Sequence, residues 1–151
     1  MPSTANNFLY SLVTMMMVGT ILTFSFASYV NPLREISEVN KLKEVINHVA
    51  ARAEEALATI NECNATLSIV IPLPSTIGDR DYWVRFANDS SSAWVEGAFG
   101  KAGEVEGQKY RVYLPREAIV SGIFEGRYVL ALLNCSLEGT LPKLNLTPQS
   151  G

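Results

Sequence analysis

The sequence predicts an α+β protein in which a long N-terminal helix, first hydrophobic and then amphipathic, precedes a small antiparallel β-sandwich. Three observations carry this prediction. Residues 8–30 are uncharged, residues 39–60 repeat apolar side chains at helical spacing, and short alternating runs follow residue 66. The expected domains are a short tail (1–7), a transmembrane or filament-core helix (8–30), an amphipathic helical stalk (31–62) and an extracytoplasmic β-domain (63–151).

Composition limits the classes of function. The chain has 151 residues, of which 48% are hydrophobic, so one domain with its own core fits beyond the N-terminal stretch. The formal net charge is −3, and the Lys and Arg residues are scattered among acidic ones. A nucleic-acid-binding protein usually presents a basic face, so we expect no nucleic-acid partner.

The uncharged stretch is long enough to cross a membrane. As a helix, its 23 residues would extend roughly 35 Å, against about 30 Å of hydrocarbon core. Its Ser and Thr hydroxyls can bond back to helix carbonyls, so apolar surroundings tolerate them. We therefore expect it to lie in membrane lipid or in an apolar helical bundle. Ser25 and Ala27 would allow cleavage as a signal peptide, and a buried helix of a soluble core is the other alternative.

Orientation depends on two opposed signals. Arg34, Lys41 and Lys43 follow the span and the tail has no basic residue, which alone would place the β-domain in the cytoplasm. That rule weakens for large translocated domains, whereas two cysteines, a strand-rich composition and four N-glycosylation triplets favour the exterior. We expect the β-domain outside. The candidate acceptors are Asn64, Asn88, Asn134 and Asn145.

A heptad-spaced stripe of apolar residues follows the span. Asn31-Pro32 would either cap a new helix or kink a continuing one. The stripe can pack on the β-domain of its own chain or on copies of itself, and heptad spacing does not distinguish the two. For helix self-association the candidates are Val18 and Ile21 in the span and Val39, Leu42, Ile46, Val49, Ala53, Ala56 and Ile60 in the stripe.

The β-domain is expected to contain short strands separated by turn-forming residues. Residues 100–108 contain three glycines and are expected to form a loop. The spacing of the strands is typical of a small antiparallel sandwich or barrel. The expected strands are 66–73, 81–87, 93–99, 109–114, 126–136 and 141–146.

No residue pattern predicts catalysis, a metal or a cofactor. His48 is the only histidine and has no partners at metal-ligand spacing, and Ser90–Ser92 have no nearby base. Asp79-Arg80-Asp81 is expected to cap a turn rather than hold a cation. Trp83 and Trp94 can fill a core or stack on a sugar ring. We expect a protein that is not an enzyme.

The two cysteines, Cys63 and Cys135, lie at either end of the predicted β-domain. In oxidising surroundings a disulfide between them would close most of the domain and stabilise it by about 4 kcal/mol in the chain-entropy model. The alternative is two buried free thiols. We expect the disulfide.

The succession of Phe8–Val30, the stripe Val39–Ile60 and the strands after Thr66 resembles archaeal type IV pilins, archaellins and their membrane-anchored accessory subunits. The resemblance implies a non-enzymatic subunit of a cell-surface filament, with helices of several copies packed in the core and β-domains outside. Residues 1–7 lack the Lys or Arg followed by Gly at which prepilin peptidases cut. The alternative is a single-pass anchored surface protein that binds a partner or glycan without polymerising.

Overall fold

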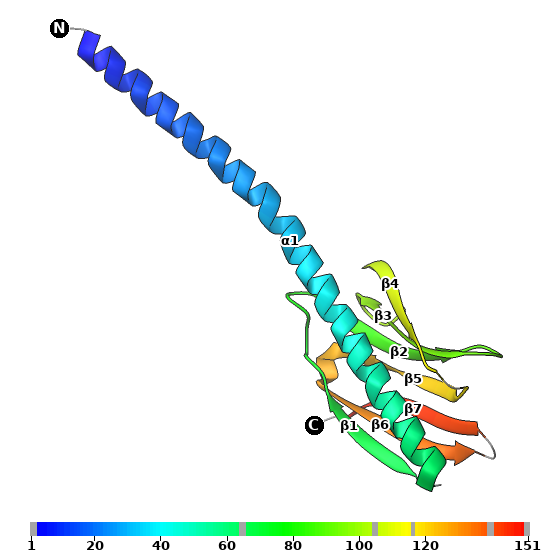
Figure 1. Cartoon of the computed structure of the whole chain (residues 1–151). Helices are drawn as coiled ribbons and strands as arrows, with labels where there is room; N and C mark the ends of the chain where they lie inside the picture. Colours follow the sequence, from blue (N-terminus) through cyan, green and yellow to red (C-terminus); the bar gives the residue numbers. More distant parts are fainter. Residues whose placement is uncertain (1–2, 64–65, 104–105, 116, 139–140, 150–151) are drawn as a thin grey trace. The chain divides into compact units, whose positions relative to one another are not determined.

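The computed structural model describes residues 3–63, 66–103, 106–115, 117–138 and 141–149. One helix comes first and seven strands follow, with a 3-10 turn between the fifth and the sixth (Figure 1). The elements are α1 (Ser3–Cys63), β1 (Leu67–Pro72), β2 (Tyr82–Asn88), β3 (Ala93–Phe99), β4 (Glu106–Tyr113), β5 (Ile119–Glu125), η1 (Gly126–Tyr128), β6 (Leu130–Glu138) and β7 (Leu141–Gln149).

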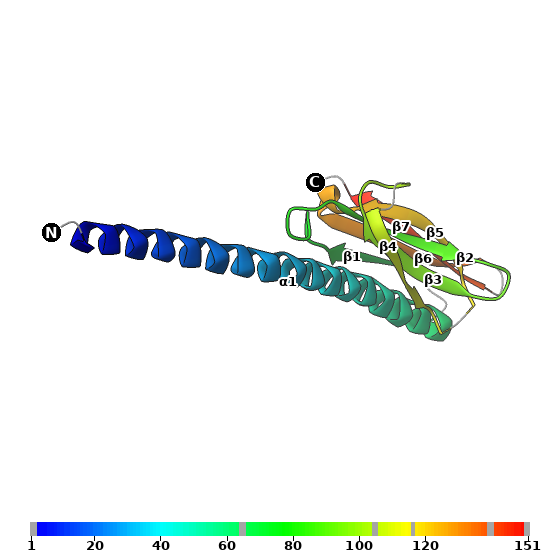
Figure 2. The same ribbon diagram turned by 90° about the horizontal axis from the view of Figure 1, so that it is seen from above.

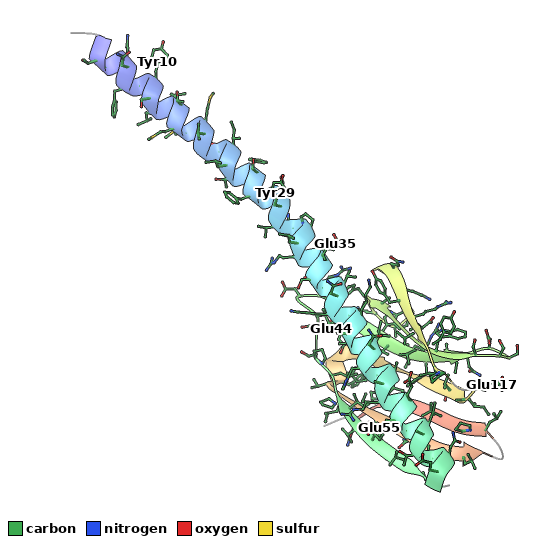
Figure 3. The ribbon with its side chains drawn as sticks, viewed as in Figure 1. Tyr10, Tyr29, Glu35, Glu44, Glu55 and Glu117 are labelled. Atoms are coloured by element: carbon green, nitrogen blue, oxygen red, sulfur yellow. The ribbon has the colours of Figure 1, made fainter. Side chains whose placement is uncertain are left out.

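The chain divides into two compact units, Met1–Ser37 and Glu38–Gly151. In the first unit α1 carries apolar side chains all round its surface, including Tyr10 and Tyr29, which are labelled in Figure 3. The large apolar side chains from Phe8 to Leu33 are between 44% and 78% exposed. Pro32 lies inside α1, so the helix continues through Asn31-Pro32 instead of starting again there.

The second unit is one sheet with a helix on one face. Its seven strands run in the order β1-β6-β7-β5-β2-β3-β4, and the part of α1 from residue 38 onward lies across the sheet (Figures 1 and 2). Only β5 and β7 pair in parallel; the other neighbouring pairs are antiparallel. In Figure 2 the helix covers one face of the sheet and leaves the other open.

The core lies between this helix and the sheet. Its aliphatic and aromatic strand residues, such as Val84, Phe124 and Leu133, are fully buried. The stripe packs against them, as the first of its two alternatives, packing on its own domain, predicts. Each stripe residue from Leu42 on is at most 1% exposed and has no surface left for a second copy, while Val39 is partly buried on the same core. The buried members are Leu42, Ile46, Val49, Ala53, Ala56 and Ile60.

The α+β class is confirmed, but the expected sandwich is wrong, because the layer opposite the sheet is the helix rather than a second sheet. The 126–136 segment begins as a 3-10 turn before β6, and β4 begins at Glu106, inside the expected loop. Strand β5 was not expected. It has Gly122 at its centre, and glycine weakens a strand signal.

Gly122 of β5 stands in register with Leu146 of β7, whose backbone leaves no room for a side chain. It has a φ of +111°, and a Cβ there would lie 2.0 Å from the carbonyl oxygen of Leu146. We expect Gly122→Ala to lower the free energy of unfolding by about 2 kcal/mol or more, because φ strain and a backbone clash add. Urea unfolding of the full chain in detergent measures this. Gly103→Ala is the matched control, because Gly103 is also at positive φ but has open space around it. This substitution should lower the free energy of unfolding by less than Gly122→Ala does.

Candidate functional site

The open face of the sheet carries a row of polar side chains on its β1-β6-β7-β5 half. Asn134 of β6 stands opposite both Ser68 and Asn145 in register, and Asn145 stands opposite Ser121. Each serine hydroxyl donates to an asparagine Oδ1, Ser68 to Asn134 at 2.8 Å and Ser121 to Asn145 at 3.3 Å. Hydroxyl and amide groups therefore cross four neighbouring strands.

The other half of the open face, on β2, β3 and β4, is organised by a buried carboxylate. Arg85, Glu96 and Arg111 stand side by side in register. Both arginines donate to Glu96: Arg85 Nε to Oε1 at 3.0 Å, with a second bond from its Nη2, and Arg111 Nε to Oε2 at 2.9 Å. Glu96 is 1% exposed, whereas the arginine side chains are 45% and 47% exposed. One carboxylate thus fixes two guanidinium groups at the surface.

Aromatic rings flank this row. The indole N–H of Trp94 donates to Glu96 Oε2 at 3.2 Å, and Trp94 stands opposite Tyr113 with ring centroids 5.9 Å apart. Trp83 is 2% exposed and lies beneath the cations of Arg85 and Lys109, which are 5.7 and 5.6 Å from its ring centroid. Trp83 is therefore covered. Trp94 is partly buried, and the guanidinium of Arg111 lies 5.4 Å from its ring centroid. Tyr113, at 60% exposed, is the most accessible aromatic residue of the cluster.

The electrostatics of this cluster favour an ionised Glu96. Burial opposes the charge, but the hydrogen bonds from Arg85 and Trp94 and the positive charges of Arg85 and Lys109 outweigh it, so the pKa of Glu96 is lowered. Three cationic side chains (Arg85, Lys109 and Arg111) then face one carboxylate. In a chain with net charge −3, this half of the open face is locally positive.

The lowered pKa of Glu96 makes stability depend on acid pH. The unfolded chain binds its proton at about pH 4.3, before the folded chain does. The stabilisation is thus complete above that pH and is lost as pH falls through the folded pKa. We expect Glu96→Gln to lower the free energy of unfolding at pH 7 by about 1–3 kcal/mol, because two guanidinium groups lose their anion. Urea unfolding between pH 7 and pH 3 should also show that the free energy of unfolding falls less steeply with acid in the variant than in the parent chain. Equal slopes in the two proteins would contradict a lowered pKa for Glu96.

The predicted disulfide is not formed in the structure. Cys135 is a free thiol, fully buried on the helix-facing side of β6, and burial raises its pKa to about 12. Its side chain packs in the core, where it behaves as a small apolar group. The side chain of Cys63, at the end of α1, lies outside the described part of the chain. This corrects the expectation of a Cys63–Cys135 bond.

The glycosylation candidates differ in their surroundings. Asn88 ends β2 and is exposed, whereas Asn134 and Asn145 are partly buried in mid-strand within the polar row. Asn64 lies outside the described residues. Next to Asn88, the carboxylate of Asp89 accepts from the backbone N–H groups of Ser91 and Ser92, and these bonds lower its pKa. Ser91 and Ser92 thus belong to a turn that Asp89 stabilises.

The remaining candidates do not converge. Within the described residues no three His, Cys, Asp or Glu side chains lie close enough to hold a metal. His48 borders a surface hollow of about 400 Å³ with Lys41, Glu44 and the 72–78 loop. Asp79 sits in the turn before β2, and Arg80 packs over the ring of Phe99 at 4.2 Å. These positions show no acid–base constellation.

A comparison with protein families identifies the family of the chain. Residues 1–96 match the model of a family of unknown function, DUF7266. The chain belongs to DUF7266. No curated protein and no solved structure matches it. The DUF7266 match covers α1, β1, β2 and β3 as far as Glu96, so it includes both the exposed apolar helix and the buried carboxylate of the open face.

Sequence reasoning singled out Trp83 and Trp94 but missed the charged row that fixes them. A signal was present in the alternation. Within their strands, Arg85 and Glu96 share a face with Trp83 and Trp94 respectively. The missing information was the register of β2, β3 and β4, which brings charges from three strands into one line.

Proposed function

We propose that this DUF7266 protein is a non-enzymatic structural subunit of a cell-surface filament. The α1 residues 8–30 of several copies would form its core, and the β-domains would face outward. The observation that carries the proposal is the exposed, uncharged surface of α1 between Phe8 and Leu33. A contiguous apolar surface of this length is unstable in water, so a membrane or neighbouring helices must cover it.

The polar groups of this segment support apolar surroundings. Thr14, Thr20, Thr23 and Ser28 each donate the side-chain hydroxyl to the carbonyl four residues earlier, at 2.7–2.9 Å. Their hydroxyl protons are therefore satisfied within the helix and need no water. α1 is also the one described helix long and apolar enough to cross a membrane. We propose the β-domain outside the cytoplasm, as the acceptor triplets favour.

The second candidate is a single-pass membrane-anchored surface protein that binds a partner without polymerising. The stripe from Leu42 to Ile60 is buried in its own domain, so only the first unit offers an apolar surface for contacts with copies. The smaller surface for self-association favours this second candidate. In that unit Val18 and Ile21 are exposed, and they remain the proposed contacts with copies.

Electron microscopy of appendages from the native cell, with mass spectrometry of their subunit, separates the two candidates. Filaments that contain this chain and disappear on deletion of its gene support the first. Cells that carry the chain in the membrane fraction, with no filament containing it and a monomer in detergent, support the second and overturn the first.

A further inference from the structure

We infer that the corner of the open face formed by Arg111, Tyr113 and Trp94 binds an acidic saccharide, with the guanidinium group on a sugar carboxylate and the rings against the sugar. This site goes beyond a filament role and does not rest on it, because the three residues belong to β3 and β4 of one chain.

Arg111 is positioned to bind a second carboxylate. Its Nε is occupied by Glu96 at 2.9 Å, and in the described part of the chain its two terminal nitrogens have no hydrogen-bond partner. The buried carboxylate thus fixes the plane of the guanidinium while its outer edge, in a side chain 47% exposed, stays open. A planar fork held in this way suits bidentate binding of a carboxylate.

The guanidinium of Arg111 lies over the Trp94 ring, 5.4 Å from its centroid, and Tyr113 lies next to both. Tyr113 is two residues from Arg111 on the same face of β4, about 7 Å along the strand, which is comparable to one pyranose residue. Tyr113 is 60% exposed, and its ring is inclined by 56° to that of Trp94. Glu96 holds Trp94 in place through the indole N–H. Sugar C–H groups pack on such rings, and little conformational entropy is lost because Trp94 is already fixed.

Charge selects an anionic sugar over a neutral one. Arg85, Lys109 and Arg111 outnumber Glu96 on this half of the face, so the local potential is positive although the whole chain is negative. Among the described strands β4 pairs only with β3, so the corner lies at a sheet edge.

The test is a titration of three ligands into the full chain in detergent micelles, with binding measured by calorimetry and by tryptophan fluorescence. Trigalacturonate is the probe, maltotriose is the neutral saccharide and triglutamate is the anion without sugar. We expect trigalacturonate to bind at least tenfold more tightly than either, with an affinity that falls as salt rises. Arg111→Gln and Tyr113→Ala should each weaken it at least tenfold, and Arg111→Lys should weaken it because the charge stays but the fork is lost.

Lys41→Gln, which removes an exposed cation on α1, is the matched control and should bind as the parent chain does. Near-UV circular dichroism checks that each variant is folded. If Arg111→Gln does not fold, Lys109→Gln takes its place, since it removes another cation from the same half of the open face. Equal affinity for triglutamate or maltotriose overturns the inference, as does absence of trigalacturonate binding. A changed oligomeric state in the Arg111 and Tyr113 variants without loss of saccharide binding also overturns it, because a second copy would then be the occupant.

Discussion

Replacing Ile21 by lysine is expected to move the chain out of the membrane fraction. Ile21 lies near the middle of the uncharged stretch and is 65% exposed, so it faces whatever surrounds the helix. A lysine at the centre of a spanning helix costs about 3 kcal/mol on insertion scales, which corresponds to roughly a hundredfold change in the insertion equilibrium. Carbonate extraction of membranes, with immunoblotting of the pellet and supernatant, measures the shift.

Two matched variants show that depth, not charge alone, causes this effect. Tyr29→Lys places the same charge near the end of the stretch, where a lysine can reach the interface, and should be retained far better. Ile21→Leu keeps the apolar surface and should behave as the parent chain does. Equal extraction of Ile21→Lys and Tyr29→Lys would contradict a membrane position for this segment. In a filament, Val18→Asp and Ile21→Lys should also prevent assembly, since a buried unpaired charge separates the helices.

Replacing Ile46 by alanine is expected to lower the free energy of unfolding by about 2–5 kcal/mol. Ile46 is 0% exposed and packs where β3 has Gly97, at which a Cβ would lie 3.0 Å from the Ile46 Cδ1 atom. The glycine leaves room for this side chain, so truncation opens a cavity between helix and sheet that the rigid strand cannot fill. Urea unfolding in detergent, followed by near-UV circular dichroism, gives the change.

The same experiment distinguishes packing within one chain from packing between copies. His48→Ala, on the exposed side of the same helix, is the control and should change stability by less than about 0.5 kcal/mol. The cost of Ile46→Ala should not depend on protein concentration, because the contact is intramolecular. A midpoint that rises with concentration for the parent chain but not for the variant would instead assign Ile46 to contacts between copies.

Much of the helix could be predicted from sequence because its signals are local. The absence of charge between Phe8 and Val30 is a matter of local composition, and the 3-4 spacing from Val39 to Ile60 is a matter of local periodicity. What covers the stripe is not local information. The same heptad fits a sheet or a second helix, and only the tertiary structure shows that it packs on the sheet.

The strands show the same limit. β3 was predicted with its observed ends, Ala93 and Phe99, because turn residues flank it. β5 was not predicted, because Gly122 interrupts its apolar run and its need for glycine comes from the backbone of β7. The Arg85–Glu96–Arg111 row depends on register across three strands, which alternation within one strand does not reveal.

The place of β7 in the sheet sets the order in which the fold can be completed. β7 is the last of the seven strands in sequence, yet it lies between β6 and β5 and joins the β1-β6 pair to the β5-β2-β3-β4 group. Until it is synthesised, the two groups of strands have no shared edge. The sheet can therefore be completed only after β7 has been synthesised, and until then the apolar face of α1 has no continuous sheet to pack on.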